Sequence, residues 1–265
     1  MNIFMHEMRA NRKSTIIWSI SLILLTILFM SMYTAFSKDA EEFINVMSNY
    51  PEPVRRAFGI NLDDFFSILG FYSYPLSIIT LCGAIQAMNL GTGIVSKEIR
   101  EKTADFLLTK PVTRTAILTA KVLAAFFSLV ITFVLFFAAA VLMANAVKTD
   151  DFSLKIFFLL SLTVLLVQLI FMAIGIMVSV IARKLKSVLA VSLPIVFAFY
   201  FVGMFFDTTE EEAKRYISPF KYFDTAYIMK HAGLEAPFLL AGAMIVILAI
   251  AASYFVYSKK DIHAV

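Results

Sequence analysis

The side chains that most often perform catalysis are scattered in this sequence of 265 residues. Its three histidines, His6, His231 and His263, fall in different segments, so they lack the spacing of a zinc site. Cys82 is the only cysteine and stands inside an apolar run, which excludes an intrachain disulfide and a cysteine-based metal cluster. We therefore expect this chain to bind no metal and no cofactor of its own.

The sequence also lacks the glycine-rich loops that bind nucleotide phosphates. Neither G-x-x-x-x-G-K-[ST] nor G-x-G-x-x-G occurs, and Gly91-Thr92-Gly93 is a single G-x-G inside an apolar run. The nucleophile motif G-x-S-x-G is absent as well. An intramembrane enzyme is therefore disfavoured, and any chemistry that drives this protein is expected on another chain.

Three neutral amides are the polar side chains that stand out within the apolar stretches. Gln86 and Asn89 are three residues apart, and Gln168 lies near the middle of a later stretch. One interpretation places them on a transport pathway or at a seam between subunits. The other has them hydrogen-bonding between packed helices, where each bond contributes about 0.6 kcal/mol.

The same stretches contain almost no charged residues, and one carries a row of small residues. An ionised group in mid-membrane is costly and is normally retained for function, so its absence disfavours an ion-coupled secondary transporter. Gly83, Ala87 and Gly91 repeat at intervals of four, a spacing that permits close approach of two helices.

Composition defines the fold class. Hydrophobic residues make up 60% of the chain and charged residues 16%, whereas an ordinary soluble domain is about half apolar and about a quarter charged. A membrane span needs about 20 apolar residues. We predict an all-α integral membrane protein forming one domain over residues 1–265. Its six transmembrane helices are expected at 15–36, 76–96, 115–146, 156–182, 187–206 and 236–258.

Three details of the spans follow from their ends. Residues 70–75, rich in aromatic side chains, are expected at the membrane interface ahead of the second span. Lys121, near the start of the third span, is expected to extend its ammonium to the headgroups. Residues 2–13 are amphipathic and predict a helix along the inner interface, with a frayed basic tail as the alternative. The stretch 14–37 has no charge over 24 residues, long enough to be a retained span and not a cleaved signal.

The distribution of basic residues predicts the orientation. With both termini on one side, that side carries 14 Lys and Arg against 5 Asp and Glu, and the other side carries 9 against 14. The first side is therefore expected in the cytoplasm. This places the segment Val95–Arg114 in the cytoplasm, between the second and third spans.

Val95–Arg114 has the pattern of a short amphipathic helix. Ile99, Thr103, Phe106 and Lys110 follow helical spacing, and charged residues occupy much of the remaining surface. Pro111 is expected to end this helix because it lacks an N–H group. Thr113 is expected to cap the helix that begins next.

The run from Glu98 to Arg114, followed by Ile117-Leu118 and Lys121, resembles the signature of ABC-2 type transporter permeases. In that family an acidic residue precedes a Gly-Thr pair, several leucines, Pro-Val-Ser/Thr-Arg and a later lysine. Here Lys102 stands where glycine is usual. The resemblance extends loosely over the whole chain and includes the stretch 218–224, Ser-Pro-Phe-Lys-Tyr-Phe-Asp, before the last span.

This resemblance implies a permease subunit in the cell membrane of a prokaryote, with both termini cytoplasmic. It implies a second permease subunit, identical or different, and separate cytoplasmic nucleotide-binding subunits that carry ATP and Mg²⁺. The segment Val95–Arg114 would be the coupling helix that docks on the ATPase. The residues expected at this contact are Glu98, Ile99, Arg100, Glu101, Thr103, Asp105, Phe106, Leu107, Pro111 and Arg114.

Export of a small or amphiphilic cargo is the expected activity, since export is the usual direction in the resembled family. No nucleic-acid partner is expected, because no basic groove accompanies the aromatic residues. The alternative is a membrane anchor or sensor module that recruits a cytoplasmic partner without moving a substrate.

Overall fold

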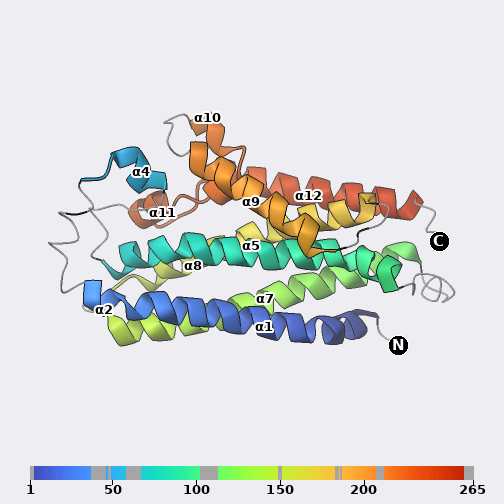
Figure 1. The fold of residues 1–265 in the computed structure, drawn as a ribbon, viewed down its shortest axis with the longest axis horizontal. Helices are drawn as coiled ribbons and strands as arrows, with labels where there is room; N and C mark the ends of the chain where they lie inside the picture. Colours follow the sequence, from blue (N-terminus) through green and yellow to red (C-terminus); the bar gives the residue numbers. More distant parts are fainter. Residues whose placement is uncertain are drawn as a thin grey trace.

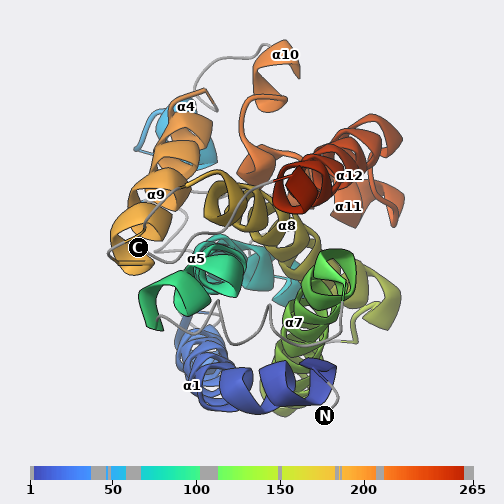
Figure 2. The ribbon, with the colours of Figure 1, turned by 90° about the vertical axis from the view of Figure 1, so that its right-hand side faces the viewer.

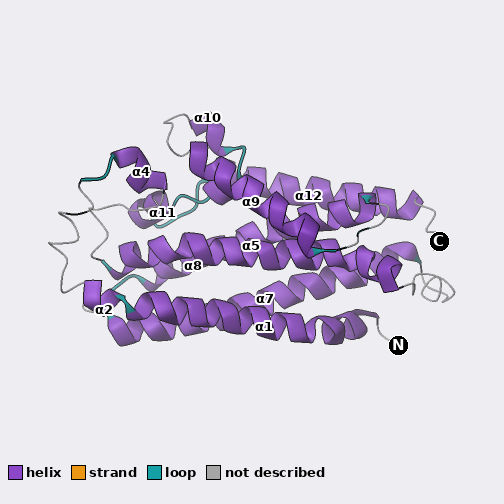
Figure 3. Ribbon diagram, in the orientation of Figure 1, coloured by secondary structure: helices purple, strands orange, loops and turns teal. Residues whose placement is uncertain are grey.

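The computed structural model describes residues 3–36, 46, 49–57, 67–101, 113–148, 151–182, 185, 187–206 and 212–259. Figure 3 shows that the described part of the chain forms helices joined by loops. The long helices are α1 (Ile3–Ser31), α5 (Ile68–Glu101), α7 (Arg114–Val147), α8 (Leu154–Ile181), α9 (Leu189–Phe206) and α12 (Ala236–Lys259). The short ones are α2 (Tyr33–Phe36), α4 (Glu52–Ala57), α10 (Glu212–Arg215), the 3₁₀ turn η1 (Pro219–Lys221) and α11 (Thr225–His231).

The six long helices are each long and apolar enough to cross a membrane, which confirms the predicted all-α class with six spans. Two of them, α1 and α5, begin more than two helical turns before the predicted spans. α1 starts at Ile3, so the expected interfacial segment and the first span form one helix. α5 starts at Ile68 and continues through Pro75, so residues 70–75 are its first turns, and their Phe71 and Tyr72 are buried.

The long helices lie along a common long axis, and the start of α1 and the end of α12 lie at the same end of the bundle (Figure 1). Viewed along that axis, α5 and α8 lie in the middle, α1 and α7 on one side, and α9 and α12 farther out (Figure 2). In this view the first turns of α1 cross toward α7, whereas the rest of the helix is seen more nearly end-on. The burial of the side chains agrees with this central position, because α5 and α8 are the most buried of the six spans.

α5 and α8 form a parallel pair whose backbones touch. A Cβ on Gly91 would lie 2.3 Å from the carbonyl oxygen of Met172, and one on Gly175 would lie 2.7 Å from that of Met88. Only glycine fits at either position, since real Cβ contacts are never this short. The close approach predicted from the row of small residues is therefore present, with α8 as the partner.

Polar and aromatic contacts extend this pairing over the full length of both helices. Near their starts the ring of Tyr72 stacks on Phe157 at 4.3 Å, and its hydroxyl is 2.9 Å from Oγ of Ser161. Near their ends the N–H of Ser96 donates to Oγ of Ser179 at 3.2 Å. Because all these contacts join residues at similar sequence offsets, the two helices run side by side in one direction.

α1 and α7 form a second parallel pair. Phe4 meets Phe127 edge to face at 5.7 Å, and farther along Oγ of Ser19 donates to Oγ1 of Thr132 at 3.3 Å. α1 carries little buried surface elsewhere. Its attachment to the bundle thus depends chiefly on α7.

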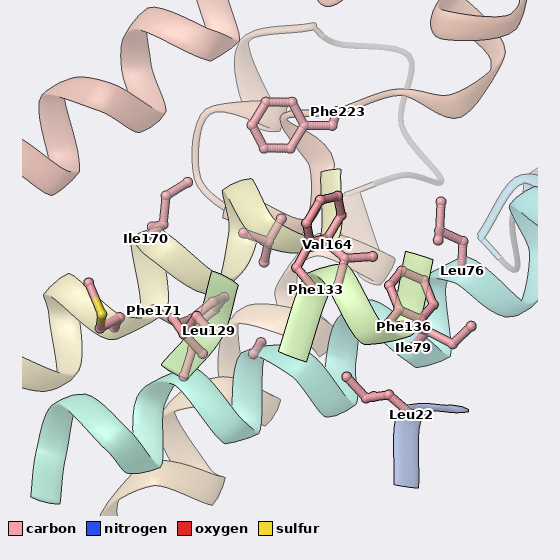
Figure 4. Packing of buried hydrophobic residues seen from close by; sticks show 14 of the residues in the cluster. Leu22, Leu76, Ile79, Leu129, Phe133, Phe136, Val164, Ile170, Phe171 and Phe223 are labelled. Atoms are coloured by element: carbon pink, nitrogen blue, oxygen red, sulfur yellow. The ribbon is translucent and has the colours of Figure 1, made fainter. Parts of the chain in front are cut away.

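The two pairs share one apolar core, to which α1, α5, α7 and α8 all contribute (Figure 4). The labelled side chains there are Leu22, Leu76, Ile79, Leu129, Phe133, Phe136, Val164, Ile170, Phe171 and Phe223. Phe223 comes from the segment between α9 and α12, so the return loop contributes to the same core. Dense packing of such side chains is the main stabilising contact between membrane helices.

The outward faces of the spans remain apolar. Ile17 and Leu28 of α1 are 63% and 56% exposed, and Leu240 and Ile247 of α12 are both 65% exposed. Large exposed apolar surfaces of this kind mark contact with lipid or with other proteins. They give the bundle the surface that a bilayer requires.

The segment 212–235 forms the short helices α10, η1 and α11 between α9 and α12. Arg215 holds it together through two hydrogen bonds to the Glu235 carboxylate, of 2.6 and 3.2 Å. The guanidinium also lies 4.0 Å from the ring centre of Phe238. Ser218 docks on α9, where its hydroxyl donates to the carbonyl of Phe199 at 2.7 Å and takes the space beside Gly203.

Candidate coupling region and polar interior

In the sequence, the predicted coupling segment joins the end of α5 to the start of α7, and these two helix ends lie at the end of the bundle where α1 begins (Figure 1). α5 stays helical to Glu101, so the backbone of Glu98, Ile99, Arg100 and Glu101 continues the second span. Their side chains lie outside the described part of the structure. Thr103, Asp105, Phe106, Leu107 and Pro111 lie wholly outside the described residues.

The start of α7 is formed as the sequence predicts. Arg114 is its first residue, and the hydroxyl of Thr113 accepts a hydrogen bond from the N–H of Ala116 at 3.3 Å. This cap satisfies one of the free N–H groups of the first turn. The predicted N-cap at Thr113 is confirmed.

Lys121 lies two turns into α7 and does not reach toward the headgroups. Its side chain is 2% exposed, and its ammonium donates to Oε1 of Glu7 at 3.0 Å and to the carbonyl oxygen of Ile94 at 2.9 Å. The snorkelling prediction was wrong because two acceptors are available inside the bundle, one of them charged. We call this group, formed by Lys121, Glu7 and the Ile94 carbonyl, the Lys121 bridge.

The last turns of α5 are also fastened to α8 and α9. Besides the bond from Ser96 to Ser179, the hydroxyl of Ser192 on α9 donates to Oγ1 of Thr92 at 3.5 Å. The hydroxyl of Ser96 also donates a hydrogen bond to the carbonyl oxygen of Thr92, at 2.6 Å. The helix α5, which leads into the predicted coupling segment, is therefore bonded to three neighbouring helices within one and a half turns.

A second polar group lies deeper in the bundle and includes two of the predicted amides. Nε2 of Gln168 donates to Oε1 of Gln86 at 3.2 Å, and Nε2 of Gln86 donates to Oγ1 of Thr132 at 2.9 Å. Ser19 adds the fourth helix through its bond to Thr132. Gln86 and Gln168 are 0% and 1% exposed, so within this chain they bond between packed helices.

Asn89 is not part of this network. Its Oδ1 is buried without a hydrogen-bond partner among the described residues, and the same holds for Oε1 of Gln168. Buried acceptors of this kind are uncommon in native structures. The structure thus brings Gln86 and Gln168 together and leaves Asn89 one turn away.

The histidines stay apart. His6 is exposed on α1, His231 stacks on Tyr227 at the end of α11, and His263 lies outside the described residues. Within the described ranges, no three His, Cys, Asp or Glu side chains come close enough to hold a metal ion.

Six apolar helices around a shared core, with lipid-compatible outer faces and a short polar connection between the second and third helices, define a multi-pass membrane protein. The sequence matches the ABC-2 family transporter proteins over residues 1–262. The chain therefore belongs to this family, and it is a permease subunit of an ABC transporter, a transmembrane component that is not itself catalytic. A search of curated proteins found no match.

Several interior residues were not anticipated from the sequence. The buried partners Glu7, Ser19 and Thr132 were missed, although a signal was present on α7. Lys121, Ser128 and Thr132 are the polar residues between positions 121 and 132, and they fall on one side of the helix. A polar stripe on an apolar span indicates a face directed at other helices.

Proposed function

We propose that this subunit exports a small or amphiphilic substrate, and that a separate ATP-binding-cassette subunit supplies the energy by hydrolysing Mg²⁺-ATP. The segment Val95–Arg114 receives the movement of that ATPase. The observation that carries this proposal is the family match together with the position of the segment, between the ends of α5 and α7 at one end of the bundle.

The charge distribution supports a cytoplasmic position for this end. Fourteen Lys and Arg and five Asp and Glu belong to the termini and the connections beside them. Both termini would then face the cytoplasm, where ATP is available. Segment Val95–Arg114 would present charged and apolar side chains there to a partner.

Two permease subunits, identical or different, would assemble with two nucleotide-binding subunits. The exposed apolar faces of the spans offer enough surface both for lipid and for a second permease. An amphiphilic cargo fits the neutral polar group deep in the bundle, since Gln86, Gln168 and Thr132 can bind dipoles but attract no particular charge.

The decisive test begins with the ATPase that copurifies with the tagged full-length chain. In the Glu98→Lys/Glu101→Lys variant we expect weaker association with that ATPase, while the helical content stays unchanged. The matched control is Lys148→Glu, a charge reversal at the other end of α7. It is expected to leave association unaffected.

The complex is then reconstituted in liposomes and assayed with a fluorescent phospholipid analogue and an amphiphilic dye. Movement of a probe that requires ATP hydrolysis supports the proposal. Full association and coupled transport in the Glu98/Glu101 variant would refute the coupling role of this segment. An ATPase that binds but is neither stimulated nor able to move a probe would favour the membrane-anchor alternative.

A further inference from the structure

We infer that Lys121 is a positioning residue for energy coupling, which makes the helices on either side of the coupling segment, and the N-terminal turns of α1, move together. This inference rests on the proposed function, because it assumes that an input arrives at Val95–Arg114. It concerns residues to which neither the family match nor the proposal gives a role.

The geometry joins three helices at one ammonium group. Lys121 on α7 donates to the backbone carbonyl of Ile94 on α5 and to the carboxylate of Glu7 on α1, at 2.9 and 3.0 Å. The lysine is 2% exposed and the glutamate side chain 16%. The bridge is thus enclosed by protein, and bulk water and salt weaken it little.

The Lys121 bridge lies close to both ends of the connection between α5 and α7. Ile94 precedes the end of α5 at Glu101 by about two helical turns, and Lys121 follows the start of α7 at Arg114 by about two turns. The bridge therefore closes the base of the connection that contains the coupling segment. A displacement of that segment cannot separate α5 from α7 without breaking a buried charge-assisted hydrogen bond.

Glu7 extends the effect to α1. Phe4 and Met8, on the same side of the helix as Glu7, contact Phe127 and Ser128 of α7. The N-terminal turns are therefore held against α7 by an aromatic contact, a sulfur contact and one ion pair. Of these only the ion pair also reaches α5, through the shared lysine.

Stability alone does not account for a lysine at this place. A buried ion pair is often no more stabilising than apolar side chains of similar volume, because both charges lose their hydration. What an apolar residue cannot do is bind a carboxylate and a carbonyl from two other helices at fixed directions. The bridge defines how three helix ends are arranged.

In the first part of the test, hydrogen–deuterium exchange is measured on the full-length chain alone in lipid nanodiscs. In Lys121→Met we expect exchange in residues 3–13 and 94–101 to rise about tenfold or more, since a buried charged hydrogen bond is lost. Glu7→Gln is expected to raise exchange in residues 3–13. Lys121→Arg, which keeps a positively charged donor at this position, is expected to show exchange close to that of the wild type. The matched control is Glu235→Gln, which breaks the Arg215 ion pair within the return segment and is expected to change neither region. Wild-type exchange in Lys121→Met would overturn the inference.

The second part repeats the exchange measurement on the complex with its ATPase, without nucleotide and with ATP plus orthovanadate. In the wild type, trapping is expected to alter exchange at residues 97–114 and also at residues 3–13. In Lys121→Met the response at 97–114 remains and the response at 3–13 is lost, although the ATPase still binds. Equal responses at both sites in the variant would overturn the transmitting role. A wild-type complex with no response at 97–114 would refute the proposed function, and the transmitting role with it, whereas the first part separately decides whether the bridge holds the helices.

Discussion

Gly91 and Gly175 face each other across the contact between α5 and α8, each occupying space that a Cβ on the other helix would need. A Cβ on Gly91 would also lie 2.9 Å from the backbone nitrogen of Ile176. The two central helices therefore meet backbone to backbone close to the end of α5, just before the predicted coupling segment. This contact sets the distance at which every side chain around it can pack.

Replacing Gly91 by Val should force α5 and α8 apart, because the clash is with backbone and not with a movable side chain. Overpacking of this kind lowers the free energy of unfolding by about 1–3 kcal/mol or more. Gly93 provides a control two residues away, since no atom of the described residues lies within 4 Å of the position of its Cβ. Gly93→Ala should leave stability unchanged or raise it by up to about 1 kcal/mol. Thermal unfolding in detergent compares the two, and equal stabilities would contradict the backbone contact.

The bond between Gln86 and Gln168 should contribute little to stability despite its burial. Hydrogen bonds between membrane helices average about 0.6 kcal/mol and reach about 1.7 kcal/mol, because the unfolded chain in a membrane also finds partners. A double-mutant cycle of Gln86→Leu and Gln168→Leu, followed by unfolding in sodium dodecyl sulfate, measures this coupling. If transport fell sharply while the coupling energy stayed in this range, the amides would have a role on the substrate pathway as well.

Arg215→Gln should loosen the return segment 212–235. The variant loses both bonds to Glu235 and the contact with Phe238, and bonds to charged groups contribute about 1.5–3 kcal/mol each when they are well enclosed. We expect the lower part of that range, because the side chains of Arg215 and Glu235 are 23% and 16% exposed. Limited proteolysis should then cut within this segment before the spans. Arg215→Lys should be cut almost as readily, since an ammonium cannot bind the carboxylate in the same two-point manner; resistance equal to the wild type would argue against the clamp.

Asp151, in the connection between α7 and α8, should titrate below an ordinary aspartate. The ammonium of Lys148, 2.6 Å away, lowers the pKa of this carboxyl group by hydrogen bonding and by its charge. A folded-state pKa below the unfolded value means that the pair stabilises the fold at neutral pH and that this contribution is lost as the pH falls through the lowered pKa. NMR titration of Asp151 should show its pKa rising in Lys148→Gln. An unchanged pKa would show that the pair does not form in solution.

The sequence was sufficient to predict the spans because a bilayer imposes length and composition on each one separately. Thr113 was predictable for a similar reason, since an N-cap depends on the residues next to it. The row Gly83, Ala87 and Gly91 correctly predicted a close helix contact. It could not identify Gly175 as the partner, because pairing depends on the arrangement of the whole bundle.

Lys121 illustrates the opposite case. Its position near the end of a span permits two outcomes, extension to the headgroups or burial with an acid, and hydropathy does not distinguish them. The outcome depends on Glu7, which lies 114 positions away in the sequence. Pairings at such separations follow from the fold and are not visible in local patterns.

The pairing of α1 with α7 and of α5 with α8 has a consequence for how the chain is made. α1 leaves the ribosome far ahead of α7, so it enters the membrane without the helix that later covers Ser19 and without the lysine that later binds Glu7. α5 likewise waits for α8 before its glycine surface is covered. Insertion of the spans and their packing are therefore separate stages, and a chain halted before α7 is complete should expose polar side chains to lipid. Proteases that recognise exposed polar groups in membrane helices would therefore be expected to cleave such an incomplete chain.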